Sequence, residues 1–189
     1  MKSLHILLCM LLSATLLMGA TSAGTFGPRL IGDAYVDAEN EDDNFGDEDT
    51  LWVASEDGAP LKITVLSYGQ IGGKTVDDIE SATLEIYVTE VEEAGEVEVH
   101  FYDDGFFETT LYWSDEIEYD EEIDDVISIE KEGWYTFDVT ELMKKAVEEC
   151  QTCPFSIVLV TEDEDTSIGF ASRENSDDNA AVLKYATFE

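Results

Sequence analysis

The segments Thr83-Leu-Glu-Ile-Tyr-Val88 and Glu96-Val-Glu-Val-His-Phe101 show the clearest pattern in this 189-residue chain. In the first, Leu84, Ile86 and Val88 alternate with more polar neighbours, and the second repeats the same period of two. This period places alternate side chains on opposite faces of a β-strand. Each segment is therefore predicted to be a strand with one buried and one wet face.

Short apolar runs of similar character recur between Gly, Asp and Asn clusters. They cover residues 30–36, 51–54, 61–66, 111–113, 126–129, 134–139, 155–160, 168–171 and 182–188. About ten short strands predict an all-β fold, an antiparallel jelly-roll-like β-sandwich. Residues 140–149 are the exception, because Leu142, Met143, Ala146 and Val147 follow helical spacing after Thr140, a residue suited to an N-cap.

The N-terminus has the order of a secretory signal peptide. A basic start at Lys2 precedes an apolar run over residues 4–18, too short to span a membrane, and small residues follow up to Ala23. We predict that residues 1–23 are removed and that residues 24–189 form one secreted domain, extracellular or at the cell surface. A retained membrane anchor is the alternative, but we expect no membrane insertion after cleavage.

The charge is strongly one-sided. Asp and Glu number 45 against 9 Lys and Arg, a formal net charge of −36 at pH 7, and loss of Lys2 with the signal peptide would make it −37. Such a field repels nucleic-acid phosphates and anionic membrane surfaces. Hydrophobic residues make up 44% and aromatic residues 11%, which is too much packable surface for a disordered tail. The sequence predicts a folded acidic domain that binds no nucleic acid.

Two cysteines remain after Cys9 leaves with the signal peptide. Cys150 and Cys153 are an even pair in an oxidising compartment, which predicts a local disulfide. A thioredoxin-like redox motif is the alternative. Such a motif opens a helix, whereas this pair follows the predicted one.

Seven motifs follow one another across nearly the whole mature chain. They are Asp33-Ala-Tyr-Val-Asp37, Asn44-Phe-Gly46, Leu51-Trp-Val53, Ile79-Glu-Ser-Ala-Thr-Leu-Glu-Ile-Tyr-Val88, Phe107-Glu-Thr-Thr-Leu-Tyr-Trp113, Gly133-Trp-Tyr-Thr-Phe-Asp-Val-Thr140 and Phe170-Ala-Ser-Arg-Glu174. Their order resembles that of the DNRLRE-domain family, secreted β-sandwich domains related to carbohydrate-binding modules and to archaeal disaggregatase-related repeats. The resemblance implies a jelly-roll-like sandwich, and such modules often carry a structural Ca²⁺.

Residues 37–49 place eight carboxylates in 13 residues. Hard oxygen ligands of this kind suit Ca²⁺, although the spacing does not match an EF-hand. The predicted ligands are Asp37, Asp43, Asn44 and Asp47, and a solvated acidic loop is the alternative. Asp138 is a further candidate, for which a structural hydrogen-bonding role is favoured over metal ligation.

Aromatic side chains are the candidates for stacking on sugar rings. These candidates are Trp52, Tyr68, Tyr112, Trp113, Tyr119 and Trp134. Trp113 and Trp134 are expected inside, while Tyr112 alternates with Leu111 and Trp113 and is the preferred surface candidate. Arg173 is predicted first as an ion-pair partner and second as a ligand for a sugar hydroxyl or carboxylate.

Catalysis has little support, because the mature chain has one histidine, His100, and no nucleophile-elbow motif. Two non-enzymatic functions remain. The sequence alone favours a structural subunit of an extracellular filament or surface layer, self-associating through strand addition or Ca²⁺. An apolar segment with Thr25, Phe26, Leu30 and Ile31 would supply the added strand, unless it is the first strand of its own sheet. The second function is a free-standing module that binds an extracellular or cell-wall polysaccharide.

Overall fold

The computed structural model describes residues 27–177 and 179–188. The predicted signal peptide, Thr25 and Phe26 lie outside these residues. The strands are β1 (Leu30–Asp37), β2 (Thr50–Glu56), β3 (Ala59–Tyr68), β4 (Ile79–Glu93), β5 (Gly95–Tyr102), β6 (Ile123–Ile129), β7 (Gly133–Asp138), β8 (Phe155–Val160), β9 (Asp165–Ala171) and β10 (Val182–Thr187). Helix α1 covers Thr140–Cys150, and short 3-10 helices cover Val76–Asp78, Glu108–Thr110 and Trp113–Asp115.

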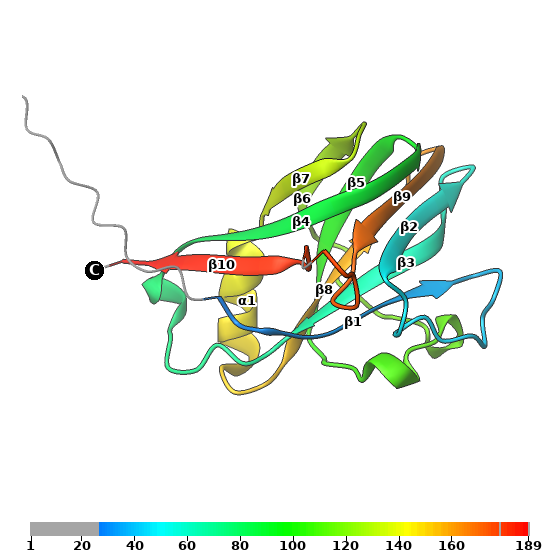
Figure 1. Cartoon of the computed structure of the whole chain (residues 1–189). Coiled ribbons are helices and arrows are strands. Elements are labelled where there is room, and N and C mark those ends of the chain that lie inside the picture. Colours follow the sequence, from blue (N-terminus) through cyan, green and yellow to red (C-terminus); the bar gives the residue numbers. More distant parts are fainter. Residues whose placement is uncertain (1–26, 178, 189) are drawn as a thin grey trace, which may run out of the picture.

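The strands form one antiparallel sheet in the order β10-β4-β9-β2-β3-β8-β5-β6, with β1 paired to β3 and β7 paired to β4 (Figure 1). Two strands pair with three partners each. β3 joins β1, β2 and β8, and the 15-residue β4 joins β7, β9 and β10. The predicted antiparallel all-β sandwich with one short helix is confirmed.

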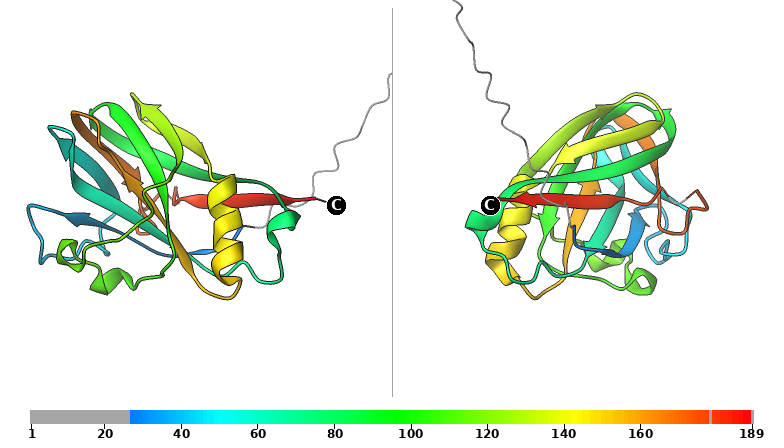
Figure 2. Two further views of the ribbon diagram at one scale, coloured as in Figure 1. Left: turned by 180° about the vertical axis from the view of Figure 1, so that it is seen from behind. Right: turned by 60° about the vertical axis from the view of Figure 1, so that its left-hand side comes forward.

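The sheet curls so that strands far apart in its order enclose one hydrophobic core (Figure 2). The alternating residues of β4 and β5 behave as predicted, since Leu84, Ile86, Val88, Val97 and Val99 are all fully buried. The four apolar residues predicted for the helix, Leu142, Met143, Ala146 and Val147, pack against the same core. Period-two and helical patterns thus converge on one interior.

Two local predictions are wrong. The N-cap position of α1 is Val139 rather than Thr140, whose hydroxyl instead donates to Asp138 Oδ1 at 2.6 Å and accepts from the Ala82 amide at 3.0 Å. Residues 111–113 form no strand, because Leu111 and Tyr112 lie between two 3-10 helices in the connection from β5 to β6 and Trp113 begins the second of these helices. Within the described residues, no helix has the length and apolar character needed to cross a membrane.

Candidate functional site

One outer face of the sheet is covered by the connection between β5 and β6, residues 103–122, which we call the cover segment. Beneath it lie Ala34 and Val36 of β1, Ile63 and Val65 of β3, and Val158 and Val160 of β8. All six positions of β8 are buried, because this strand is apolar on both faces. Leu111 of the cover segment completes this second hydrophobic cluster, with Phe106, Trp113, Ile117 and Tyr119 packed around it.

Hydrogen bonds to neighbouring segments fix the cover segment in place. Asn44 Nδ2 donates to the carbonyl oxygens of Glu108 and Leu111 at 2.7 and 3.0 Å. The Ser156 hydroxyl donates to the Asp104 carbonyl at 2.7 Å. Gly46 allows the close approach, because a Cβ added there would lie 2.3 Å from the Glu108 carbonyl oxygen. The loop after β1 therefore holds the cover segment against the sheet.

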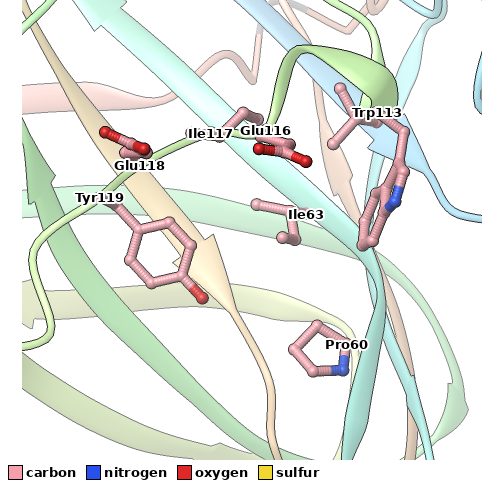
Figure 3. A pocket seen from close by; sticks show the side chains of 8 residues that line it. Pro60, Ile63, Trp113, Glu116, Ile117, Glu118 and Tyr119 are labelled. Atoms are coloured by element: carbon pink, nitrogen blue, oxygen red, sulfur yellow. The ribbon is translucent and has the colours of Figure 1, made fainter.

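A pocket of about 330 Å³ opens between the cover segment and the sheet. Trp113 and Tyr119 stand on opposite sides of Ile63, with Pro60 below (Figure 3). Val36, Ile117, Glu116 and Glu118 complete its lining. Among the described lining residues two are carboxylates and none is Lys, Arg or His. The pocket can thus hold an apolar ring face between aromatic side chains while its glutamates accept hydrogen bonds.

A second aromatic surface lies on the outward side of β4 and β7, which we call the open face, with Glu85, Tyr87, Trp134 and Thr136 as its members. The rings of Tyr87 and Trp134 meet edge to face with centroids 5.4 Å apart. Trp134 is 52% exposed, so the prediction that it lies inside is wrong. Phe137, on the opposite face of β7, lies in the main core instead. Trp134 and Thr136 are exposed, so this surface is uncovered, in contrast to the second cluster.

The remaining predicted aromatics have different surroundings. Tyr68 is fully buried in the main core, and Trp52 is partly buried, with Lys62 Nζ 5.6 Å above its ring. Tyr112 is partly buried but does not line the pocket, and its backbone amide donates to Asp115 Oδ2 at 2.9 Å. Trp113, expected inside, is partly buried: it packs against the second cluster and also lines the pocket. Tyr119 is the second aromatic residue of the pocket.

Among the described residues, Asp37, Asp43 and Asp47 do not belong to a group of three carboxylates close enough to share one ion. Asp37 accepts hydrogen bonds from Glu39 and Asn40 at 2.9 and 3.1 Å, and Asn44 holds the cover segment. Asp43 and Asp47 are exposed. Asp138, on β7, accepts two hydrogen bonds from Thr140. This ligand set remains a prediction.

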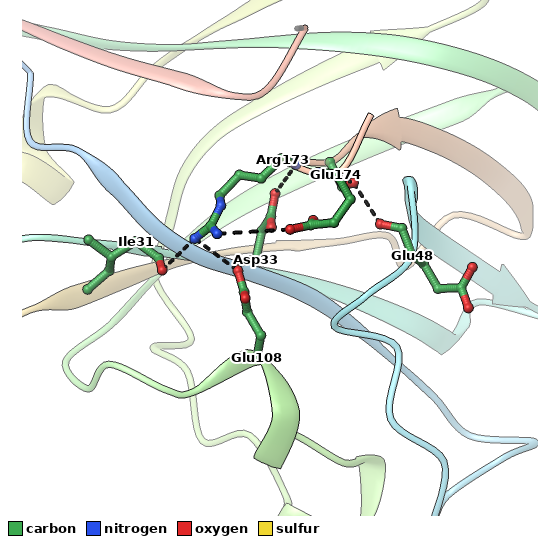
Figure 4. A network of polar contacts seen from close by, with 7 residues as sticks. Ile31, Asp33, Glu48, Glu108, Arg173 and Glu174 are labelled. Atoms are coloured by element: carbon green, nitrogen blue, oxygen red, sulfur yellow. Dashed lines mark hydrogen bonds and ion pairs between the residues drawn. The ribbon is translucent and has the colours of Figure 1, made fainter. Parts of the chain in front are cut away.

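A different carboxylate cluster joins β1, the cover segment and the loop after β9. Carboxylate oxygens of Asp33, Glu108 and Glu174 lie within 4.8 Å of one another (Figure 4). Burial raises the pKa of Asp33 to about 7, opposed by a hydrogen bond from the Arg173 amide. Sequence reasoning missed this cluster, although Asp33 is the one charged residue in the predicted strand over residues 30–36.

Arg173 lies within this cluster as an ion-pair partner. Its Nη1 is 3.0 Å from Glu108 Oε1 and donates to the Ile31 carbonyl at 2.5 Å. Ile31 is otherwise exposed, while Leu30 pairs with Tyr68 of β3, so both residues belong to the first strand of their own sheet. Cys150 and Cys153 form the predicted disulfide, with an S–S distance of 2.06 Å.

These features define a β-sandwich protein with an aromatic pocket on one outer sheet face. Residues 27–186 match the model of carbohydrate-binding module family 96, and the chain belongs to this family. No curated protein matches the chain. The match agrees with the relation to carbohydrate-binding modules that the DNRLRE resemblance implies, and membership of the DNRLRE family itself stays a prediction. It favours the glycan-binding function over the filament subunit, and a binding module is compatible with the absence of catalysis predicted from the sequence.

Proposed function

We propose that this protein is a secreted carbohydrate-binding module and that the pocket between Trp113 and Tyr119 holds sugar rings of an extracellular polysaccharide. The family match over residues 27–186 is the observation that carries this proposal. The pocket supports it, because its lining combines aromatic side chains with carboxylates, and both suit a sugar ligand. Secretion follows from the predicted signal peptide.

The pocket supplies two complementary interactions. The rings of Trp113 and Tyr119, with Ile63 and Pro60 between them, offer apolar area to the C–H face of a pyranose. Burial of apolar area stabilises a complex by about 25 cal/mol per Å² before the costs of association. Glu116 and Glu118 lie where they can accept hydrogen bonds from sugar hydroxyls, and a charged acceptor makes such a bond stronger.

The charge of the lining selects among glycans. A polyuronate would bring its carboxylates toward Glu116 and Glu118, and no described lining residue is a cation. Neutral polysaccharides therefore fit the pocket directly, whereas a polyuronate would need a divalent cation to bridge the two sets of carboxylates.

Affinity electrophoresis through gels containing neutral or uronate polysaccharides, with and without Ca²⁺, tests the proposal. The wild-type protein should be retarded by at least one neutral polysaccharide. Trp113→Ala should weaken that binding at least ten-fold, because it removes one wall of the pocket. Phe107→Ala is the matched control, since Phe107 is an aromatic residue of the same cover segment that is 80% exposed and does not line the pocket.

Glu118→Gln provides a second variant, because it removes a charge at the pocket without removing buried apolar surface. It should weaken the same interaction several-fold with an unchanged melting temperature. Retardation by no polysaccharide would overturn the proposal. Equal retardation of the wild type and a folded Trp113→Ala variant would exclude this pocket as the site.

A further inference from the structure

The carboxylate cluster of Asp33, Glu108 and Glu174 gathers residues from three separate segments of the chain. Asp33 belongs to β1, Glu108 to the cover segment and Glu174 to the loop between β9 and β10. Figure 4 shows the Asp33 carboxylate beside those of the two glutamates. Three anionic groups so close together repel one another unless a proton or a cation compensates them.

Arg173 compensates one of these charges. Its guanidinium lies 3.0 Å from Glu108 Oε1 and 3.9 Å from Glu174 Oε1. When all three carboxylates are ionised, one guanidinium leaves two negative charges, the complement of one divalent cation.

In the part of the chain that the structure describes, one carboxylate oxygen of Asp33 also lacks a hydrogen-bond donor. Its Oδ2 accepts the Arg173 amide at 2.9 Å, but its Oδ1 is buried and has no hydrogen-bond partner among the described residues. The whole residue is only 1% exposed. A buried carboxylate oxygen without a partner is costly. The Asp33 carboxylate, which contributes one oxygen to the cluster with Glu108 and Glu174, therefore has acceptor capacity left for a cation.

We propose that Asp33, Glu108 and Glu174 bind one Ca²⁺. The cluster offers only oxygen donors. Such donors suit Ca²⁺ better than Zn²⁺, which prefers nitrogen and sulfur ligands. Its ligands come from three segments, and Ca²⁺ tolerates such irregular geometry better than Mg²⁺ does. The strongly negative protein, at −36, also raises the local concentration of divalent cations.

The position of the ion gives it a structural role. It would join β1 and the loop after β9 to Glu108, and Glu108 belongs to the cover segment that forms the pocket. Removal of Ca²⁺ should therefore loosen the cover segment and lower the melting temperature. A loss of glycan affinity should accompany this change, and that part of the inference rests on the proposed function.

Calorimetric titration of the chelator-treated protein with CaCl₂ in 150 mM NaCl, without glycan, tests the site by itself. We expect one ion per chain with a Kd of roughly 0.1–1 mM, the range of extracellular modules. Asp33→Asn and Glu174→Gln should each raise the Kd at least ten-fold. Asp47→Asn is the matched control, because it removes an exposed carboxylate from the acidic loop without touching the cluster.

Thermal unfolding separates loss of the ion from loss of the fold. With EDTA, Asp33→Asn should melt at or above the wild-type temperature, because it removes an uncompensated buried charge. With saturating Ca²⁺ it should melt below the wild type. The inference is overturned if the wild type takes up no Ca²⁺, or if Asp47→Asn abolishes binding that Glu174→Gln retains. Absence of glycan binding alone would overturn the proposed function and leave the metal site standing.

Discussion

The outer faces of the sheet differ in one respect: the face formed by β1, β3 and β8 is covered, and the open face of β4 and β7 is not. Beneath the cover segment, β8 is buried at all six positions. On β7, Trp134 and Thr136 are exposed while Phe137 is buried. Apolar residues on both sides of a strand require a cover, whereas alternation leaves one side to solvent.

This difference separates two kinds of aromatic residue. Trp134 stands on an uncovered surface, where a ligand would touch it from one side. Trp113 and Tyr119 stand on opposite sides of Ile63 in the pocket lining and can contact a ligand from two sides. Enclosure removes more ligand surface from water, which is why we propose the covered face rather than the open face as the sugar-binding site.

The largest expected contrast in stability lies along β7 itself. Phe137→Ala should lower the free energy of unfolding by about 3–5 kcal/mol, because it opens a cavity in the main core. Trp134→Ala should change it by less than about 0.5 kcal/mol, as is usual for surface positions. Urea unfolding followed by circular dichroism measures both. Similar losses from the two variants would show that the open face is covered in solution.

The interior could be predicted from the sequence because alternation shows which residues share a face. It could not show whether the outward face is covered. The prediction that Trp134 lies inside rests on its place in a strand of the DNRLRE resemblance, but Trp134 shares its face of β7 with the exposed Thr136. Residues 111–113 are predicted as a strand because they form a short apolar run, but Leu111 is buried as part of the cover segment.

The carboxylate cluster escaped prediction for another reason. Asp33 contacts Glu108 across 75 positions and Arg173 across 140 positions of the sequence. The dense acidic run at residues 37–49 attracted the metal prediction because its residues are adjacent in sequence. Adjacent carboxylates can point apart into solvent, while distant ones are brought together by strand pairing.

Asn44 offers an intermediate effect that tests the attachment of the cover segment. Asn44→Ala should cost about 1–3 kcal/mol, because two backbone carbonyls lose their donor. Its sugar affinity should fall, whereas Trp134→Ala should leave affinity unchanged. Thermal melts and affinity electrophoresis of both variants provide the measurements.

Asn44→Asp distinguishes this attachment from the metal role predicted from the sequence. A carboxylate there would face the carbonyl oxygens of Glu108 and Leu111 and should destabilise the protein, with Ca²⁺ binding unaltered. If Asn44 is instead a Ca²⁺ ligand, the added charge should tighten Ca²⁺ binding. That result would contradict the structural assignment of Asn44.

The smallest effect concerns Asp124 on β6. This residue belongs neither to the covered face nor to the open face, so its substitution is a reference for changes in stability that should leave sugar binding unaltered. Burial, together with the charge of Glu122, raises the pKa of Asp124 to about 6, from a value of 3.8 when unperturbed. The folded protein therefore holds this proton more tightly than the unfolded chain does. The stability contributed by the neutral carboxyl is complete below pH 4 and is lost as the pH rises through 6.

Asp124→Asn removes this loss, because the amide stays neutral at every pH. At pH 7.5 the variant should exceed the wild type in unfolding free energy by about 1 kcal/mol, a figure reduced for solvent screening at a half-buried group. Near pH 4 the two proteins should be equal. Glu122→Gln should reproduce part of the gain by removing a neighbouring negative charge. Denaturant titrations from pH 4 to 8 measure the difference, and a constant offset across that range would contradict the raised pKa. Sugar affinity should not change in either variant, because β6 contributes no residue to the pocket among those described.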